Sequence, residues 1–436
     1  MTESIRSALA LIEQRLDCEL TAASLARETG YSPWHFQRLF SQEMGTTVTA
    51  YVLERRLHRA VERMGAGESG VEAALRYGFD TYAGFYKAFV KYFGCSPRAY
   101  LRLYPEHPAS NGRLMLTEKE LRAVLETWPQ TKNLPLETLH IPSGQPRQDA
   151  WFVGDDYMLK HSDYARISRA ARLGMALDAQ GFPAMRPVAT AQGDLFTPGA
   201  EPFLLMNRLH GRRLDAEAYL ASDGRLPFCA GQALARLHHA LLQVESDIPA
   251  DECSPSAMLA EWAFPEACRQ AVQWQMPVTE AELAEVAKTL AALEPHLPKQ
   301  LIHRDPNPSN LIFDGEAITG FADFDLSERN VRLWDVCYMA TGILSEAHQK
   351  DDPRWLHVLQ SILQGYHQQS PLTPEERQAV WPMLCGIVLI CIAAFAHNDV
   401  LYQVAAANRA MLQSLFQWRH PIEKMVAAIT QKGLRP

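Results

Sequence analysis

The sequence predicts a two-part protein: an all-α domain with two helix-turn-helix units, followed by a larger α+β domain. Three observations support this prediction. An internal repeat fills the first hundred residues, a Pro- and Gly-containing break follows near residue 105, and strand-like runs then alternate with long helical patterns. With 436 residues, 47% of them apolar and 21% charged, the chain is long enough for two or three globular domains.

Composition narrows the class of protein. The net charge of −8 divides unevenly, with +1 over residues 1–107 and −9 over the remainder. A +1 domain is weakly basic for a nucleic-acid binder, so the positions of its charges must carry that argument. The eight cysteines are scattered singly, without CxxC or Cys/His metal spacing, and Met1 leads into an amphipathic helix. We therefore expect a reduced, cytoplasmic protein without a structural zinc site.

The most apolar run, residues 383–396, is too short to cross a membrane. A spanning helix needs about 20 apolar residues. Pro382 precedes the run and His397 follows it. It therefore predicts a buried helix of a large domain, and we expect no membrane partner.

The repeat identifies two related units. Ala26, Gly30 and Tyr31 recur 48 residues later as Ala74, Gly78 and Phe79. After a one-residue insertion, Phe36, Phe40, Gly45 and Tyr51 recur as Phe85, Phe89, Gly94 and Tyr100. Each copy indicates a short helix, a Gly-containing turn and a longer helix, which is the helix-turn-helix arrangement.

The second helix of each copy has an outward face. In the first copy this face carries Trp34, Gln37, Arg38 and Ser41, and in the second it carries Ala83, Gly84 and Lys87. Between the copies, residues 49–64 predict one helix of about 24 Å. Its arginines, Arg55 and Arg59 among them, are candidates for phosphate contacts, with solvated helix charges as the alternative.

These segments, including "GFDTYAGFYKAFVKYFGCSPRAYLR", resemble the AraC/XylS family of transcription regulators over about the first 104 residues. The resemblance implies that two recognition helices enter successive major grooves of double-stranded DNA. On this chain it assigns base contacts to Trp34, Gln37 and Arg38 in the first helix and to Ala83, Gly84 and Lys87 in the second. Arg suits guanine and Gln suits adenine, so the first helix is the richer reader. Packing against the domain core is the alternative role for Trp34, and RNA polymerase is a further candidate partner.

The segment 301–325, LIHRDPNPSNLIFDGEAITGFADFD, carries the chemistry of the second domain. Asp305 and Asn310 share a loop that Pro306 and Pro308 keep from being helical. The Asp314-Gly315 pair predicts a hairpin whose second strand ends at Asp323. Phosphoryl transfer needs a carboxylate to orient the attacking hydroxyl, and an Asn with an Asp to hold Mg²⁺. We assign Asp305 as catalytic and Asn310 and Asp323 to the metal; an acidic surface hairpin is the alternative.

This pattern, with "LWDVCYMA" around Asp335, resembles the aminoglycoside phosphotransferase and choline kinase group of protein-kinase-like enzymes. The resemblance implies a two-lobed fold with ATP and Mg²⁺ as cofactors. It places the phosphate-binding lysine at Lys160, and backbone groups around Leu204, Met206 and Asn207 against adenine. The predicted boundaries are 1–107 for the AraC-type domain, 108–131 for a linker and helix, and 132–436 for the kinase-like domain. Its small lobe covers about 132–206 and its large lobe about 207–436.

Two features depart from that pattern. The helix predicted after Lys160 has no acidic residue from 164 to 177, and Ala170 or Ala171 stands where a Glu partner of the lysine is expected. The loop 141–149 has a single glycine. Both features favour slow turnover or ligand sensing, and a surface strand lysine is the alternative role for Lys160.

The sequence leaves two functions open. In the first, a sequence-specific DNA-binding transcription regulator senses a nucleotide or a small hydroxyl or amine ligand through its kinase-like domain. In the second, an active ATP-dependent small-molecule O-phosphotransferase, acting on an amino sugar, a choline-like compound or a related alcohol, regulates its own genes. The acidic segment 246–255, with Trp262 and Trp274 beyond it, predicts a substrate rim for a cationic compound, with a solvated loop as the alternative.

Overall fold

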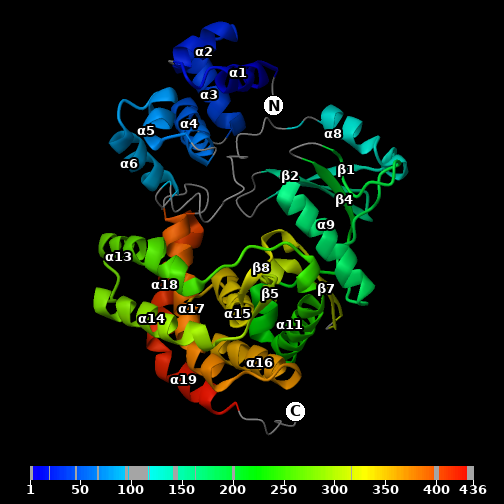
Figure 1. Ribbon diagram of the computed structural model, residues 1–436, viewed down its shortest axis with the longest axis vertical. Helices are drawn as coiled ribbons and strands as arrows, with labels where there is room; N and C mark the ends of the chain where they lie inside the picture. The colour runs from blue at the N-terminus through cyan, green and yellow to red at the C-terminus, as the bar shows by residue number, and fades with distance from the viewer. Residues whose placement is uncertain are drawn as a thin grey trace. The chain divides into compact units, whose positions relative to one another are not determined.

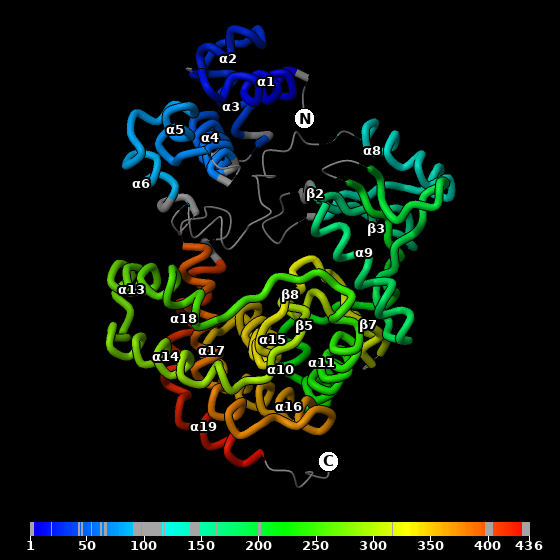
Figure 2. The backbone as a smooth tube through the Cα atoms, in the orientation of Figure 1, coloured from blue at the N-terminus to red at the C-terminus, as the bar shows by residue number. Residues whose placement is uncertain are grey.

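The computed structural model describes residues 3–18, 20–44, 47–65, 68–93, 97, 116, 118–140, 146–162, 164–198, 202–315, 317–396 and 402–429. The chain divides into two compact units, residues 1–123 and 124–436, and each is described by itself (Figures 1 and 2). The predicted landmarks Gly45, Gly94 and Tyr100 lie outside the described residues, as do the break near residue 105 and residues 141–145 of the glycine-poor loop.

The first unit is helical wherever it is described in detail. Its helices are α1 (Glu3–Gln14), α2 (Ala22–Glu28), α3 (Pro33–Met44), α4 (Val48–Gly65), α5 (Gly70–Arg76) and α6 (Tyr82–Phe93). A further helix, α8 (Glu118–Leu125), spans the boundary between the units. An apolar core formed by α1 to α4 buries Phe36 and Phe40 of α3 completely.

Hydrogen bonds repeat with the sequence, which confirms the duplication. Thr21 and Ser69 each begin a short helix with a capping box, α2 and α5 respectively. Gly30 and Gly78 each follow that helix in the left-handed region, with φ of +77° and +78°. Past the one-residue insertion, equivalent residues are 49 positions apart. The Ser32 side chain accepts the amide of His35, and in the second copy the Thr81 side chain accepts the amide of Gly84.

The arginines of α4 mainly brace the unit. Arg55 is 3% exposed, and its guanidinium binds both carboxylate oxygens of Glu13 on α1. Arg56 donates to the main-chain carbonyls of Leu16 and Cys18. Arg55 is therefore not the solvated charge given as the alternative, and a phosphate contact would require it to leave Glu13. Periodicity could not separate these positions, because a long arginine reaches a buried acid as readily as solvent.

The second unit begins with a four-stranded antiparallel sheet in the order β1-β2-β3-β4. Its strands are β1 (Leu136–His140), β2 (Pro146–Val153), β3 (Tyr157–His161) and β4 (Phe203–Asn207). Helix α9 (Tyr164–Ala179) follows β3, and its Ala170 and Ala171 pack in an apolar cluster with residues of β3 and β4 (Figure 1). Lys160 pairs with Ala150 of β2 and with Leu204 of β4, so its backbone is fixed by neighbouring strands on both sides.

The rest of the second unit is mostly helical. Small two-stranded sheets pair β5 (Lys299–Ile302) with β8 (Glu328–Val331), and β6 (Leu311–Asp314) with β7 (Ala317–Phe321). The longer helices around them are α11 (Arg225–Val244), α13 (Phe264–Gln273), α14 (Glu280–Leu293), α15 (Leu333–Glu346), α16 (Arg354–Gln369), α17 (Pro374–Phe395), α18 (Tyr402–Gln417) and α19 (Arg419–Ala427). Shorter helical segments include α10 (Ala216–Ala221), α12 (Pro255–Met258), a 3₁₀ turn over Pro308–Asn310 and a second over Phe324–Leu326.

Two glycines let α11 and α16 approach closely. A Cβ atom on Gly231 of α11 would lie 2.1 Å from the carbonyl oxygen of Ile362. One on Gly365 of α16 would lie 2.0 Å from the carbonyl oxygen of Phe228. Any larger residue at either position would separate the helices, which carry His238 and Tyr366 of the site described below.

Helix α17 contains most of the apolar run predicted to be a buried helix. By length and composition it could cross a membrane, but 78% of its most apolar window is buried within the unit. Trp381, Met383 and Leu384 are among its buried side chains. The helix therefore serves as a core element of the large lobe.

We predict that Arg55→Ala destabilises the first unit by about 3–5 kcal/mol, because it leaves the Glu13 carboxylate without its buried partner. Hydrogen exchange of the amides of α1 and α4, measured on the full chain, reports this loss directly. Arg59→Ala is the matched control, since Arg59 is 39% exposed and its contact with Glu13 is worth about 0–1 kcal/mol. Equal protection in the two variants would show that the Arg55–Glu13 pair contributes no stability.

Candidate functional site

The first candidate site is the outward face of α3. Trp34 is 69% exposed, so it does not pack in the domain core. Gln37 and Arg38 are exposed beside it. The Arg38 guanidinium carbon lies 5.6 Å from the centre of the Trp34 ring, a cation–π distance that orients the arginine. These three side chains form one surface of aromatic, amide and guanidinium groups.

The corresponding face of α6 is smaller but contains one further aromatic ring. Ala83, Gly84 and Lys87 are all exposed, as predicted. Tyr86 is 42% exposed and occupies the position that Gln37 holds in the first copy. Sequence reasoning missed Tyr86, although applying the offset of 49 to Gln37 would have found it. Of the α4 arginines predicted to contact phosphates, Arg59 remains partly exposed.

The second candidate site lies on the segment from β5 to the 3₁₀ turn at 324–326. Asp305 follows β5 and accepts hydrogen bonds from the side-chain amides of Asn307 at 2.7 Å and Asn310 at 3.2 Å. The hydroxyl of Tyr338 also bonds to its carboxylate. Burial raises the pKa of Asp305 above its ordinary value, and the nearby charge of Asp323 adds to the rise. A raised pKa makes this carboxylate a better proton acceptor.

Asp323 is brought to the same loop by the hairpin. The predicted turn is present, with β6 ending at Asp314 and Gly315 at φ +60°. The amide of Ala322 donates to the carbonyl of Asn310 at 2.9 Å, and the His303 ring bonds to the Ala322 carbonyl at 2.9 Å. Asp323 itself is left-handed, with φ +67°.

The polar groups at this loop fit a hard cation bound with a phosphate. The Asn310 amide hydrogens go to Asp305, which leaves the amide oxygen for a cation. No group of three His, Cys, Asp or Glu side chains suitable for a metal occurs in the described part of the chain. A magnesium ion on Asn310 and Asp323 would therefore need phosphate oxygens and water to complete six ligands.

A buried carboxylate on α15 holds the backbone of the loop. Asp335 is fully buried and accepts the amides of His303 at 2.8 Å and Arg304 at 2.9 Å. The ring of His238 bonds to the same carboxylate at 3.0 Å and to the Tyr366 hydroxyl at 2.7 Å. These bonds keep Arg304 in a left-handed conformation, with φ +77°, that costs a non-glycine residue energy.

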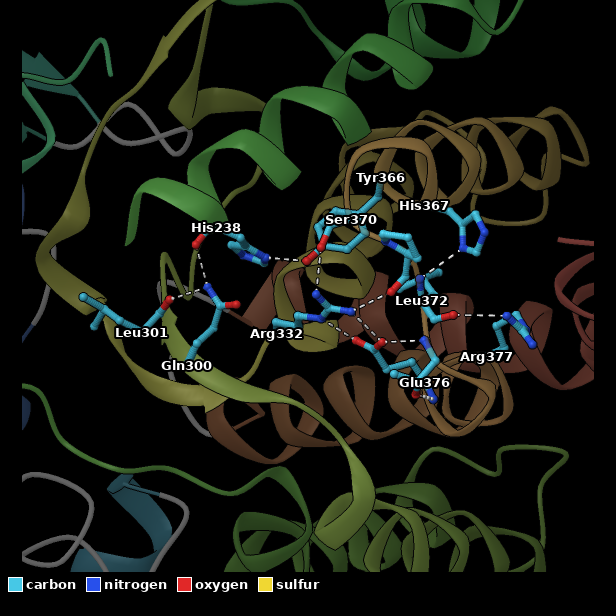
Figure 3. Close-up of polar contacts among 12 residues, drawn as sticks. His238, Gln300, Leu301, Arg332, Tyr366, His367, Ser370, Leu372, Glu376 and Arg377 are labelled. Carbon is cyan, nitrogen blue, oxygen red and sulfur yellow. Dashed lines mark hydrogen bonds and ion pairs between the residues drawn. The ribbon is translucent and has the colours of Figure 1, made fainter. Parts of the chain in front are cut away.

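The N-terminal end of helix α15 is in turn held by an ion pair. Figure 3 shows Arg332, just before α15, between Glu376 and Ser370. Its guanidinium binds both Glu376 oxygens at 2.8 Å and the Ser370 hydroxyl at 2.7 Å. Sequence reasoning gave no site role to His238, Tyr338 or Tyr366, because these contacts join residues up to 128 positions apart.

Lys160 reaches this segment from β3, which excludes its alternative as a surface lysine. Its amine lies 2.6 Å from oxygens of both Asp323 and Asp325, and its side chain is 4% exposed. Burial alone would lower the pKa of Lys160, but the two carboxylates outweigh burial and hold the pKa above its ordinary value. The lysine has no acidic partner on α9, as the sequence showed, yet it is not unpartnered.

The pairing of β4 limits which of its main-chain groups could contact a nucleotide base. Leu205 accepts the amide of Val188, and Asn207 donates to the carbonyl of Arg186, both at the edge away from β3. Because main-chain groups alternate along a strand, those of Leu204 and Met206 face β3. Leu204 is also fully buried. Groups free to meet a ligand must therefore come from Asn207 onward.

The predicted acidic rim at 246–255 is partly exposed and partly bound to the rest of the unit, since the side chains of Asp251 and Glu252 are 57% and 71% exposed. Asp251 pairs with Arg169 at 3.1 Å, and its carbonyl accepts the amide of Arg329 at 2.8 Å. Trp262 is 9% exposed. Negative charge near Asp305 comes instead from Glu346, whose pKa is raised by burial and by Asp215 and Asp305.

The comparisons with known proteins agree with the two kinds of domain. A helix-turn-helix domain model matches residues 25–103, and a phosphotransferase enzyme family model matches residues 138–378. The Transposon Tn10 TetD protein of Escherichia coli is 37% identical over 102 residues, which is 23% of this chain and 74% of that protein. A homoserine kinase of Zymomonas mobilis is 37% identical over 111 residues, which is 24% of this chain but only 33% of that enzyme.

The fold of the second unit recurs in a solved structure of a microcompartment-associated aminopropanol kinase. The TM-score is 0.52 at 14% identity, and the match covers 70% of this chain and 99% of that one. At this identity the likeness concerns the fold alone. The family matches and the two sites together show that this chain belongs to the phosphotransferase enzyme family and carries an AraC-type helix-turn-helix DNA-binding domain at its N-terminus.

Proposed function

We propose that this protein is a sequence-specific transcription regulator whose phosphotransferase-family domain binds Mg²⁺-ATP together with a small hydroxyl or amine compound. The observation that carries the proposal is the presence, in one chain, of an exposed reading face on α3 and a braced Asp305–Asn310–Asp323 loop. A ligand changes DNA binding only if it prefers one of two states of the protein, and the second unit supplies the site for such a ligand.

The reading face favours sequence-specific binding to double-stranded DNA. Arg38 and Gln37 have the chemistry for guanine and adenine, and α6 offers Lys87 with two small residues that permit close approach. Only Arg59, among the two α4 arginines assigned to phosphate, is exposed enough to reach a backbone. Sequence specificity therefore rests mainly on α3, in the first copy of the repeat.

The nucleotide arrangement follows from the residues already described. Mg²⁺ would be held by Asn310 and Asp323, and it would neutralise phosphate charge when bound. Lys160 would face the same phosphates, and the backbone from Asn207 onward would meet the base. Asp305 would orient a hydroxyl and accept its proton.

An active ATP-dependent O-phosphotransferase is the second candidate. The contacts of Asp305 favour it, because a binding site alone has no need for a braced carboxylate of raised pKa. The carboxylate of Glu346, which lies near Asp305, favours an alcohol that also carries an amine. The two candidates differ in turnover and share the nucleotide site.

We expect Arg38→Ala to reduce discrimination at the base that Arg38 contacts by about 1–3 kcal/mol. Arg59→Ala should weaken binding to all sequences alike and lower the salt dependence by about one phosphate contact. Binding of both variants to a selected operator and its single-base variants, at several salt concentrations, separates these effects. If Arg38→Ala behaves like Arg59→Ala, then Arg38 contacts phosphate only.

The nucleotide site is tested by thermal shift and calorimetry with ATP, with and without Mg²⁺, followed by a panel of alcohols and amino alcohols. We expect the wild type to bind Mg²⁺-ATP. Asp305→Asn should keep that affinity within a few-fold and lose about 10²–10⁴-fold of any phosphoryl transfer, because it removes the proton acceptor. No shift with any nucleotide would eliminate both the sensor and the kinase.

The sensor differs from the kinase in its effect on DNA. For the sensor, Mg²⁺-ATP with an active compound changes operator affinity by about 5–150-fold without consuming ATP. For the kinase, the same mixture yields a phosphorylated product, which phosphorus NMR detects. The Asp305→Asn variant should keep the first response and lose the second.

A further inference from the structure

The 3₁₀ turn after β7 places two carboxylates on one amine. Asp323 and Asp325 stand two residues apart, and the left-handed backbone of Asp323 turns the chain so that both reach Lys160. Each contact measures 2.6 Å. A buried lysine needs at least one close carboxylate to remain charged. If the carboxylate of Asp323 binds a metal, Asp325 is the carboxylate that remains in contact with Lys160.

A phosphate-binding lysine is expected to have an acidic residue beside it on the next helix, but α9 carries arginines on the side next to this turn. Its positions 170 and 171 are alanines buried in the apolar cluster. The side of α9 next to the 324–326 turn carries Arg166, which lies close enough to Asp325 to stabilise its charge. Arg169 donates to the carbonyl of Ser327 at 3.2 Å. A carboxylate at the position of Arg166 would repel Asp325, whereas Arg166 attracts it.

We propose that Asp325 is the positioning residue for Lys160 and replaces the carboxylate that α9 lacks, so that Asp323 can be given up to the metal. The 2.6 Å contact of Asp325 holds the lysine, and the charge of Arg166 on α9 favours the ionised form of Asp325. The last step rests on the proposed nucleotide function, while the anchor itself does not.

The test compares the wild type with Asp325→Asn, Lys160→Met and the double variant. The measured quantity is the factor by which Mg²⁺ increases ATP affinity, from calorimetry with Mg²⁺ and with EDTA. In Asp325→Asn, Lys160 must share Asp323 with the metal, so we expect this factor to fall about tenfold. In the Lys160→Met background, Asp325→Asn should change it less than about twofold, because no lysine is left to hold.

Two results would overturn the proposal. An equal loss in both backgrounds would make Asp325 a ligand of the metal rather than an anchor. No loss in either background would leave it without a role. Asp325→Glu keeps the carboxylate and should restore most of the factor. Asp314→Asn, which removes an exposed carboxylate at the end of β6, is the matched control and should leave the factor unchanged.

The anchor can be tested separately from the proposed function. If the wild type binds no ATP, the proposed function fails, and the same four proteins are compared by melting temperature without nucleotide. Melting shifts that do not add in the double variant support the Lys160–Asp325 anchor, and additive shifts overturn it. Should Asp325→Asn fail to fold, Asp325→Ser takes its place in both measurements.

Discussion

The buried carboxylate of Asp335 is the contact on which the phosphotransfer loop depends. It accepts two consecutive main-chain amides, and it thereby fixes the direction of the chain just before Asp305. A loop with two prolines and a left-handed arginine would otherwise sample many conformations. Burial makes the constraint strong, since a fully enclosed carboxylate without these donors would be very costly. The site is thus defined by a side chain that never meets a ligand.

Support for Asp335 extends far into the large lobe. His238 joins it to Tyr366, and the Arg332–Glu376 pair fixes the beginning of its helix. These contacts join α11, α16, α17 and the N-terminal end of α15, as the side chains of His238, Tyr366, Glu376 and Arg332 show (Figure 3). A change in any of these helices can therefore alter the geometry of the loop that carries Asp305 without touching that loop. A ligand-dependent regulator could use such a link between the loop and distant helices.

Burial separates arginines that look alike in the sequence. Arg38 is exposed and lies over an exposed indole ring, whereas Arg55 is enclosed and neutralised by Glu13. The charge of Arg38 is available to a nucleic acid, whereas that of Arg55 is paired within the domain. With a net charge of only +1 over residues 1–107, few phosphate contacts remain, so base contacts must carry a large share of specificity.

The sequence by itself determined the two kinds of domain and the repeat, and it supplied the candidate residues of the site around Asp305. The duplicated glycines, the paired prolines around Asp305 and the hairpin signal before Asp323 act locally, so their effect can be read over a few residues. Tertiary structure alone decided the partners of Lys160 and Arg55, the holding of the loop by Asp335 and His238, and the pairing of Asp251 with Arg169. Those contacts join residues distant in the chain, and whether a charge becomes an anchor, a ligand or a solvated group depends on which distant charge burial brings beside it.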